Sequence, residues 1–241
     1  MKKILIVFMI LFTTGLSFSF SLRERFNRIT GRENTVQLDD ATIIRGLKEA
    51  LNIGTDNAVK NVHRQDGYFM NQAIKILLPP SLQKVERRLR SLGLGSYIDD
   101  LILKMNRGAE KAAIKAVRIF FRAINSMTFA DAKNILNGPD DAATRYFENR
   151  TRPALYAEFF PIIKSVLDEV GATKVYKFLV QRYNKLPFVK KIHYELDEWT
   201  TNKALDGLFH MLAKEELKIR SHAAFRVTRL LQQVFGSIRR R

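Results

Sequence analysis

The chain has 241 residues, of which 46% are hydrophobic and 27% charged, a composition typical of a folded globular protein rather than a disordered one. It contains no cysteine, which excludes disulfides, thiolate metal sites and cysteine nucleophiles. Its formal net charge of +17 predicts attraction to polyanions, namely acidic lipids, phosphorylated polysaccharides or nucleic acid.

The first 21 residues are typical of a secretory signal peptide. Lys2 and Lys3 form a positive start, residues 4–12 are an unbroken apolar run, and Ser19 and Ser21 lie at candidate cleavage sites. An uncleaved membrane anchor is the competing interpretation, although the Thr, Gly and Ser residues after the run make the span only weakly apolar. We expect cleavage near Ser19 or Ser21, which leaves a periplasmic or secreted protein of net charge +15. Without a cysteine at the cut, it is not expected to be a lipoprotein.

Residues 22–38 are polar, basic and aperiodic, and we interpret them as a flexible linker. An all-α domain is predicted over residues 39–236, followed by a basic tail over residues 237–241. The first helix of the domain begins at a pair of acids, which suit the positive end of a helix dipole. Its apolar residues lie three and four apart, and Gly54 could divide it in two.

Residues 65–80 depart from helical periodicity. Asp66-Gly67 is a turn signal, and apolar residues then recur at every second position. One short strand pair near residues 68–78 is therefore conceivable. Two prolines end this segment and introduce a helix over residues 81–92.

The rest of the chain shows helical spacing of apolar residues, mostly separated by glycine or proline. The remaining helices are expected over residues 96–127, 128–138, 140–152, 154–170, 174–184, 195–220 and 223–235. The predicted fold class is therefore all-α, a compact single-domain bundle of many helices.

The helix expected over residues 96–127 carries a stripe of basic residues at intervals of three or four. These residues are Lys104, Arg107, Lys111, Lys115, Arg118 and Arg122. On one continuous helix they would lie within about 80° of one another, and Glu110 would point elsewhere. The simplest interpretation is a solvated face, yet such faces usually mix signs, because opposite charges three or four apart stabilise a helix.

The alternative interpretation of the stripe is an anion-binding surface, which agrees with the net charge of the whole chain. Acids from another helix, such as Glu215 or Glu216, could instead neutralise part of it. Phe121 adjoins Arg122 and could insert into a lipid headgroup layer or stack on a ligand.

Motifs for metals and cofactors are missing from the sequence. The four histidines share no metal-ligand spacing, and there is neither a phosphate-binding glycine loop nor a GxSxG nucleophile motif. We expect no metal and no cofactor. Asp206 and His210 have the spacing of a structural pair, and Glu215-Glu216 with Arg220 have that of an intrahelical ion pair.

Several segments resemble a family of exported bacterial proteins of unknown function, domain of unknown function 4197. They are GLKEAL (46–51), DGYFMNQAIKILLP (66–79), MNRGAEKAA (105–113), MTFADAKNILNGPDDAATRYFENRT (127–151), ALDGLF (204–209) and KEELKIR (214–220). The resemblance implies a mainly helical envelope domain behind a signal peptide, and it supplies no reaction. Ser221-His222-Ala223 lacks the break expected there, so that the helices on either side could fuse.

If the family shares a polar site, it would be drawn from the polar residues of these segments. The candidates are Asp66, Asn71, Asn106, Glu110 and Asp206.

Three functions stay open from the sequence. The first is an exported helical protein that binds anionic envelope ligands, such as phospholipid headgroups or phosphorylated glycans, through the basic stripe. The second is an envelope enzyme, hydrolase-like, with Asn106, Glu110 and Asp206 buried together in a cleft. The third is a scaffold for an unknown protein partner. Export makes nucleic acid the least favoured partner in the cell.

Overall fold

The computed structural model describes residues 39–91, 93, 95–169, 171–185, 187–188, 191, 195–222, 225–226 and 228–237. The expected signal peptide, the linker and the arginines of the basic tail lie outside the described residues. The chain divides into two units, Met1–Asp39 and Asp40–Arg241, and every element below belongs to the second.

Every regular element of the described part is helical, which confirms the predicted all-α fold class. Its elements are α3 (Asp40–His63), the 3-10 turn η1 (Pro80–Leu82), α4 (Gln83–Ser91), α5 (Gly95–Ala113), α6 (Ala116–Asn125), α7 (Phe129–Asn137), α8 (Ala142–Glu169), α9 (Ala172–Asn184), α10 (Leu196–Ser221) and α11 (Arg229–Ser237). None of the described helices combines the length and the apolar character needed to cross a membrane.

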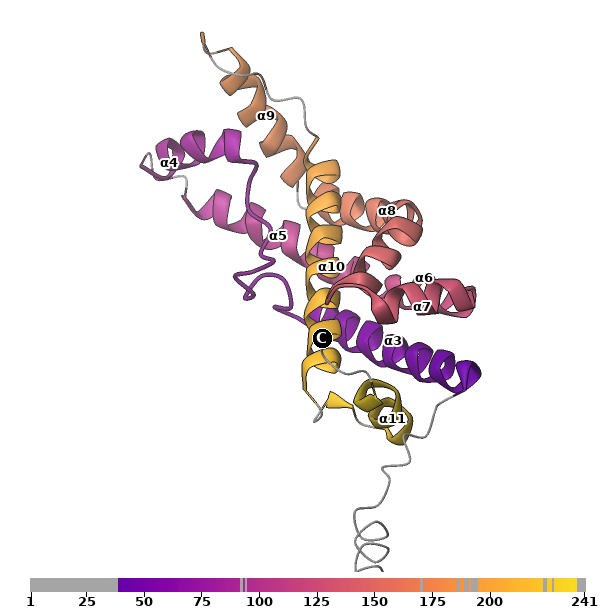
Figure 1. Ribbon diagram of the computed structural model, residues 1–241. Helices are drawn as coiled ribbons and strands as arrows, with labels where there is room; N and C mark the ends of the chain where they lie inside the picture. The colour runs from indigo at the N-terminus through magenta and orange to yellow at the C-terminus, as the bar shows by residue number, and fades with distance from the viewer. Residues whose placement is uncertain are drawn as a thin grey trace, which may run out of the picture. The chain divides into compact units, whose positions relative to one another are not determined.

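Helix α10 lies at the centre of the bundle and packs against α8, α3 and α5 (Figure 1). The ring of Phe120 of α6 has its centroid 5.4 Å from that of Phe147 of α8 and 6.2 Å from that of Phe209 of α10. Each of these rings is buried, and this spacing suits tilted aromatic pairs. The ring cluster therefore ties α6, α8 and α10 together.

Helix α3 runs without a break through Gly54, so the expected division there is wrong. Gly54 is buried, and a Cβ placed on it would lie 3.6 Å from Ile219 Cδ1 of α10. This is an ordinary van der Waals contact, so the packing of the two helices does not require glycine here, and an isolated glycine is tolerated inside the helix.

The two helices expected over residues 140–152 and 154–170 form one, α8, with Pro153 and Pro161 inside it. Both prolines are exposed. Each removes the hydrogen bond to the carbonyl four residues earlier, and those carbonyls belong to exposed residues, which water can reach. Proline is tolerated here because it lies on the exposed side of α8, where each carbonyl that it deprives of a donor belongs to an exposed residue.

The helix expected over residues 96–127 is instead two helices, because the chain turns at Ile114 and Lys115 between α5 and α6. No glycine or proline marks this turn. Beyond it the packing partners change: α5 packs mainly on α8, whereas α6 packs on α3 and α8. The break is therefore set by tertiary packing.

At the chain end the two expected helices are separate, and the fusion considered around residues 221–223 does not occur. α10 ends at Ser221, His222 is extended with φ −126° and ψ 120°, and α11 begins only at Arg229.

Candidate anion-binding surface

The basic stripe lies on both sides of the turn between α5 and α6. Lys104, Arg107 and Lys111 belong to α5, Lys115 to the turn, and Arg118 and Arg122 to α6. Lys111, Lys115, Arg118 and Arg122 are exposed, whereas the other two are half-buried. We call residues 111–122, all of which the structure describes, the α5–α6 corner.

Arg107 differs from the other cations of the stripe because two carboxylates hold it. Its Nη1 donates to Glu110 Oε2 at 2.6 Å, and its Nη2 donates to Asp66 Oδ1 at 2.8 Å. The hydrogen bond to Glu110, together with that to Asp66, raises the pKa of Arg107. Glu110, which was expected to point elsewhere, therefore neutralises one member of the stripe.

Lys115 and Arg118 share one carboxylate, Glu158 of α8, at 4.0 and 3.7 Å. At these distances the ion pairs are loose, and Arg118 keeps 62% of its side chain exposed. The expected neutralising acids, Glu215 and Glu216, bind Lys218 and Arg220 instead.

The last three cations of the stripe are Lys104, Lys111 and Arg122. None of them makes an ion pair within the described part of the chain. Apart from Arg107, the five cations of the stripe therefore have one carboxylate partner in the described part of the chain, Glu158.

Two residues of the candidate polar site, Asn106 and Glu110, hold residues 64–79 in place through hydrogen bonds. We call residues 64–79 the clasped loop. The loop opens with Asp66 at φ +64°, and a Cβ on Gly67 would lie 2.5 Å from two backbone oxygens of α3, so the tight turn requires glycine. Glu110, which is buried, accepts hydrogen bonds from the backbone N–H groups of Tyr68 and Phe69 at 3.1 and 3.2 Å. Its carboxylate is therefore fully engaged.

Asn106 takes the place of a strand partner for the clasped loop. Its Oδ1 accepts from the N–H of Ile76 at 2.9 Å, and its Nδ2 donates to the Ile76 carbonyl, also at 2.9 Å. The same amide reaches Ile102 O at 2.7 Å. This is why the conceivable strand pair near residues 68–78 is absent from the described loop, which has turns instead. One side chain satisfies the backbone groups that a second strand would have bonded.

The other two candidates also have structural partners. Asn71 Oδ1 accepts from the N–H of Ala73 at 3.2 Å, which holds a local turn. Asp206 accepts from Arg152 Nη2 at 2.6 Å and Lys203 Nζ at 2.9 Å. Burial raises the pKa of Asp206, but these hydrogen bonds outweigh it, so its pKa is lowered.

Tyr68 links the loop to α10, because its hydroxyl donates to Ala204 O at 2.7 Å. Burial raises its pKa, and the nearby Glu110 and Asp206 add to that effect. The neutral phenol therefore serves as a buried donor and not as an acid. Asn106, Glu110 and Asp206 each bind a different partner, and none is left to act on a substrate.

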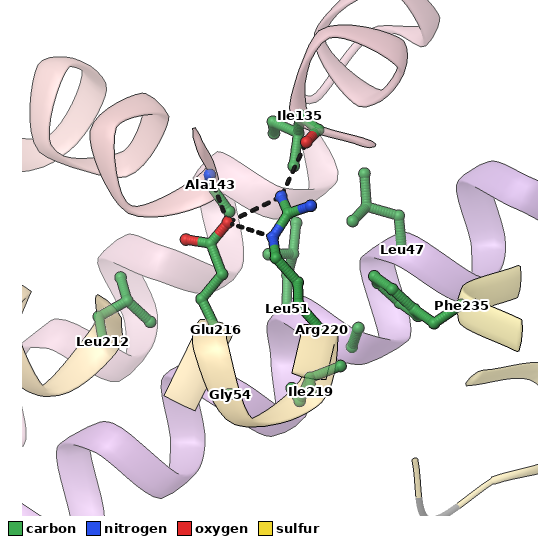
Figure 2. A pocket seen from close by; sticks show the side chains of 11 residues that line it. Leu47, Leu51, Gly54, Ile135, Ala143, Leu212, Glu216, Ile219, Arg220 and Phe235 are labelled. Carbon is green, nitrogen blue, oxygen red and sulfur yellow. Dashed lines mark hydrogen bonds and ion pairs between the residues drawn. The ribbon is translucent and has the colours of Figure 1, made fainter. Parts of the chain in front are cut away.

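A small cavity lies between α3, α7, α8, α10 and α11, with a charged pair on its wall (Figure 2). Its volume is about 20 Å³, room for one water molecule. Arg220 donates to Glu216 Oε1 at 2.8 Å, as the intrahelical pairing predicted, and also to Ile135 O at 2.8 Å. Glu216 accepts in turn from the N–H groups of Ala143 and Thr144 at the start of α8. Glu216 thus caps the start of α8, and Arg220 binds the last part of α7, so the pair has a structural role.

Sequence reasoning singled out Phe121 but missed the other two apolar side chains of the corner, Ile114 and Val117. Ile114, Val117 and Phe121 are 46%, 41% and 54% exposed. Their signal was present, since none of the three falls on the buried stripe of α5 and α6, which includes Ala112, Ala116 and Phe120.

Comparison with known proteins gives a family and no function. No curated protein and no solved structure matches the chain. The family described as "Protein of unknown function (DUF4197)" matches residues 37–236, which include every helix above except the final residue of α11. This chain therefore belongs to the DUF4197 family.

Proposed function

We propose that the protein is exported and binds anionic ligands of the cell envelope through the α5–α6 surface. The contact residues would be Lys104, Lys111, Lys115, Arg118 and Arg122. The observation that carries the proposal is the shortage of counter-charges, since these five cations have only Glu158 as a partner in the described part of the chain. A phosphate group, as a phospholipid headgroup or on a phosphorylated glycan, supplies the missing negative charge.

Export is part of the same proposal and rests on the character of residues 1–21. After their removal the mature chain keeps a net charge of +15, because they contain two lysines and no acid. An excess of this size favours adsorption to the anionic surfaces of the envelope, and salt would weaken it.

Of the other functions, the hydrolase-like enzyme loses support, because Asn106, Glu110 and Asp206 are each bound by groups of the fold itself. Arg107 leaves the set of contact residues for the same reason.

The test is co-sedimentation with vesicles of acidic or neutral phospholipid, at low and high salt, with a soluble phosphorylated oligosaccharide as competitor. We expect binding to acidic vesicles only, lost at high salt. The double variant Lys111→Glu/Arg122→Glu should abolish it. The matched control, Lys174→Glu/Lys214→Glu, changes the net charge equally at exposed lysines of α9 and α10 and should bind normally. Equal loss of vesicle binding in both variants would show that binding depends only on net charge, and it would refute the proposed contact surface.

A further inference from the structure

The exposed residues of the α5–α6 corner alternate between cationic and apolar side chains. Seven of its residues are exposed, and in chain order they are Lys111, Ile114, Lys115, Val117, Arg118, Phe121 and Arg122. No acid lies among them. Each apolar side chain therefore has a cation before and after it along the chain.

The opposite side of the corner fixes it to the bundle. Ala112, Ala113, Ala116 and Phe120 are fully buried. Lys48 of α3 adds a tie, because its Nζ donates to the carbonyl of Asn125 at the end of α6 at 3.2 Å. The exposed apolar side chains therefore cannot turn inward without breaking this packing, and they stay in solvent.

The mixture of side chains discriminates between sources of phosphate. A soluble phosphorylated glycan engages cations but leaves Ile114, Val117 and Phe121 in water. The interface of an anionic bilayer engages both kinds, because headgroup phosphates lie beside the outer acyl segments, where amphipathic helices place their apolar side chains.

We infer that the α5–α6 corner docks on an anionic phospholipid bilayer, with Ile114, Val117 and Phe121 among the outer acyl segments and Lys111, Lys115, Arg118 and Arg122 at the phosphates. This inference rests on the proposed function, which it narrows from anionic ligands in general to a membrane surface. A second copy of the chain is a poor occupant, since four cations without an acid on the exposed corner repel one another.

The chain has no cysteine, so a single introduced one can carry a polarity-sensitive fluorophore at a chosen place. We would label Phe121→Cys, Ile114→Cys and the control Phe178→Cys, whose parent side chain on α9 is 55% exposed, against 54% for Phe121. Helix α9 packs on α8 and α10. Vesicles of phosphatidylglycerol are expected to shift the emission of the two corner probes to the blue, whereas phosphatidylcholine vesicles should not, and the α9 probe should not respond.

A second variant distinguishes a failure of this inference from a failure of the proposed function. Ile114→Ser/Phe121→Ser keeps every cation and replaces side chains that are already exposed, so circular dichroism should be unchanged. We expect its partition onto phosphatidylglycerol vesicles to fall at least tenfold, with unchanged binding to inorganic polyphosphate. Unshifted corner probes on vesicles that still bind the protein would overturn the inference and leave the proposed function standing. Failure to bind either vesicles or polyphosphate would overturn both, and an equal shift at the α9 probe would show nonspecific adsorption and overturn the inference.

Discussion

The clasped loop and the α5–α6 corner both adjoin α5, yet they use charged and polar side chains in opposite ways. Beside the loop, Glu110 and Asn106 of α5 are buried and bound to backbone groups of the loop. In the corner, cations and apolar side chains face solvent together. The difference teaches that a polar residue in a segment resembling the family can have all its hydrogen bonds made within the protein itself. A surface left without partners is the better guide to binding.

The largest expected effect comes from breaking the loop. Glu110→Ala leaves the N–H groups of Tyr68 and Phe69 without their acceptor, and it leaves Arg107 with Asp66 as its remaining carboxylate partner in the described structure. Each donor left unsatisfied costs about 1–3 kcal/mol, so the two amides together cost about 2–6 kcal/mol. We expect the free energy of unfolding in urea to fall by that amount. Glu110→Gln keeps an acceptor for the amides and should lose less. A loss below about 1 kcal/mol in the alanine variant would contradict the clasp.

The next effect is steric and also concerns the loop. A Cβ on Gly207 of α10 would lie 2.6 Å from Tyr68 Cε1 and 3.1 Å from Ile74 Cβ. Gly→Ala within a helix ordinarily stabilises by about 1 kcal/mol, but here overpacking should reverse the sign, for a net loss of about 1–3 kcal/mol in thermal or urea unfolding.

Gly108→Ala of α5 is the matched control for that substitution. Its nearest neighbour would be Ile163 Cα at 3.5 Å, an ordinary contact, so this variant should be neutral or more stable. Equal behaviour of the two variants would mean that the loop does not press on α10 at Gly207.

The proposed contact residues of the basic stripe should show the reverse pattern, with altered binding and unchanged stability. Single alanine substitutions at Lys104, Lys111 and Arg122 each remove about 1 kcal/mol of attraction to an anionic membrane, which is about fivefold in vesicle binding at low salt. Since these side chains make no ion pair in the described structure, unfolding free energies should move by less than about 0.5 kcal/mol. Arg107→Ala is the contrasting variant and should lower stability, because it leaves Glu110 unpaired.

The smallest effect is a pH dependence at Asp206. Arg152 and Lys203 hold its pKa below the usual value in the folded state despite the opposing effect of burial. A carboxylate with a lowered folded pKa contributes stability above its unfolded pKa of about 3.9, and this is lost as pH falls through the folded pKa. The side chain is 44% exposed, so we expect only about 0.5 kcal/mol. Asp206→Asn should flatten the urea-stability profile below pH 4 by that amount. A profile identical to that of the parent chain would exclude Asp206 as the source.

Helical spacing of apolar residues was enough to predict the fold class and most helices, because that spacing records which face is buried. It failed where tertiary packing decides the outcome. The turn at Ile114 has no breaker in the sequence, and Pro153 looks like a boundary although α8 continues through it.

The candidate site was predicted only in part, for a similar reason. Intervals of three and four reveal a row of cations, but they cannot reveal that Asp66 and Glu158, 41 residues before Arg107 and 40 after Arg118, come to lie beside them. Nor could they show that Asn106 is occupied by the backbone of Ile76. When an acceptor comes from a distant part of the chain, only the folded structure shows which side chain it meets.

The rings of Phe120, Phe147 and Phe209 have a kinetic consequence. They hold α6 in place in the protein alone, so the membrane docking that we infer would require no rearrangement of this helix. The rate of encounter at this surface should then follow diffusion and ionic strength, whereas the lifetime of the complex reports how well its contacts fit.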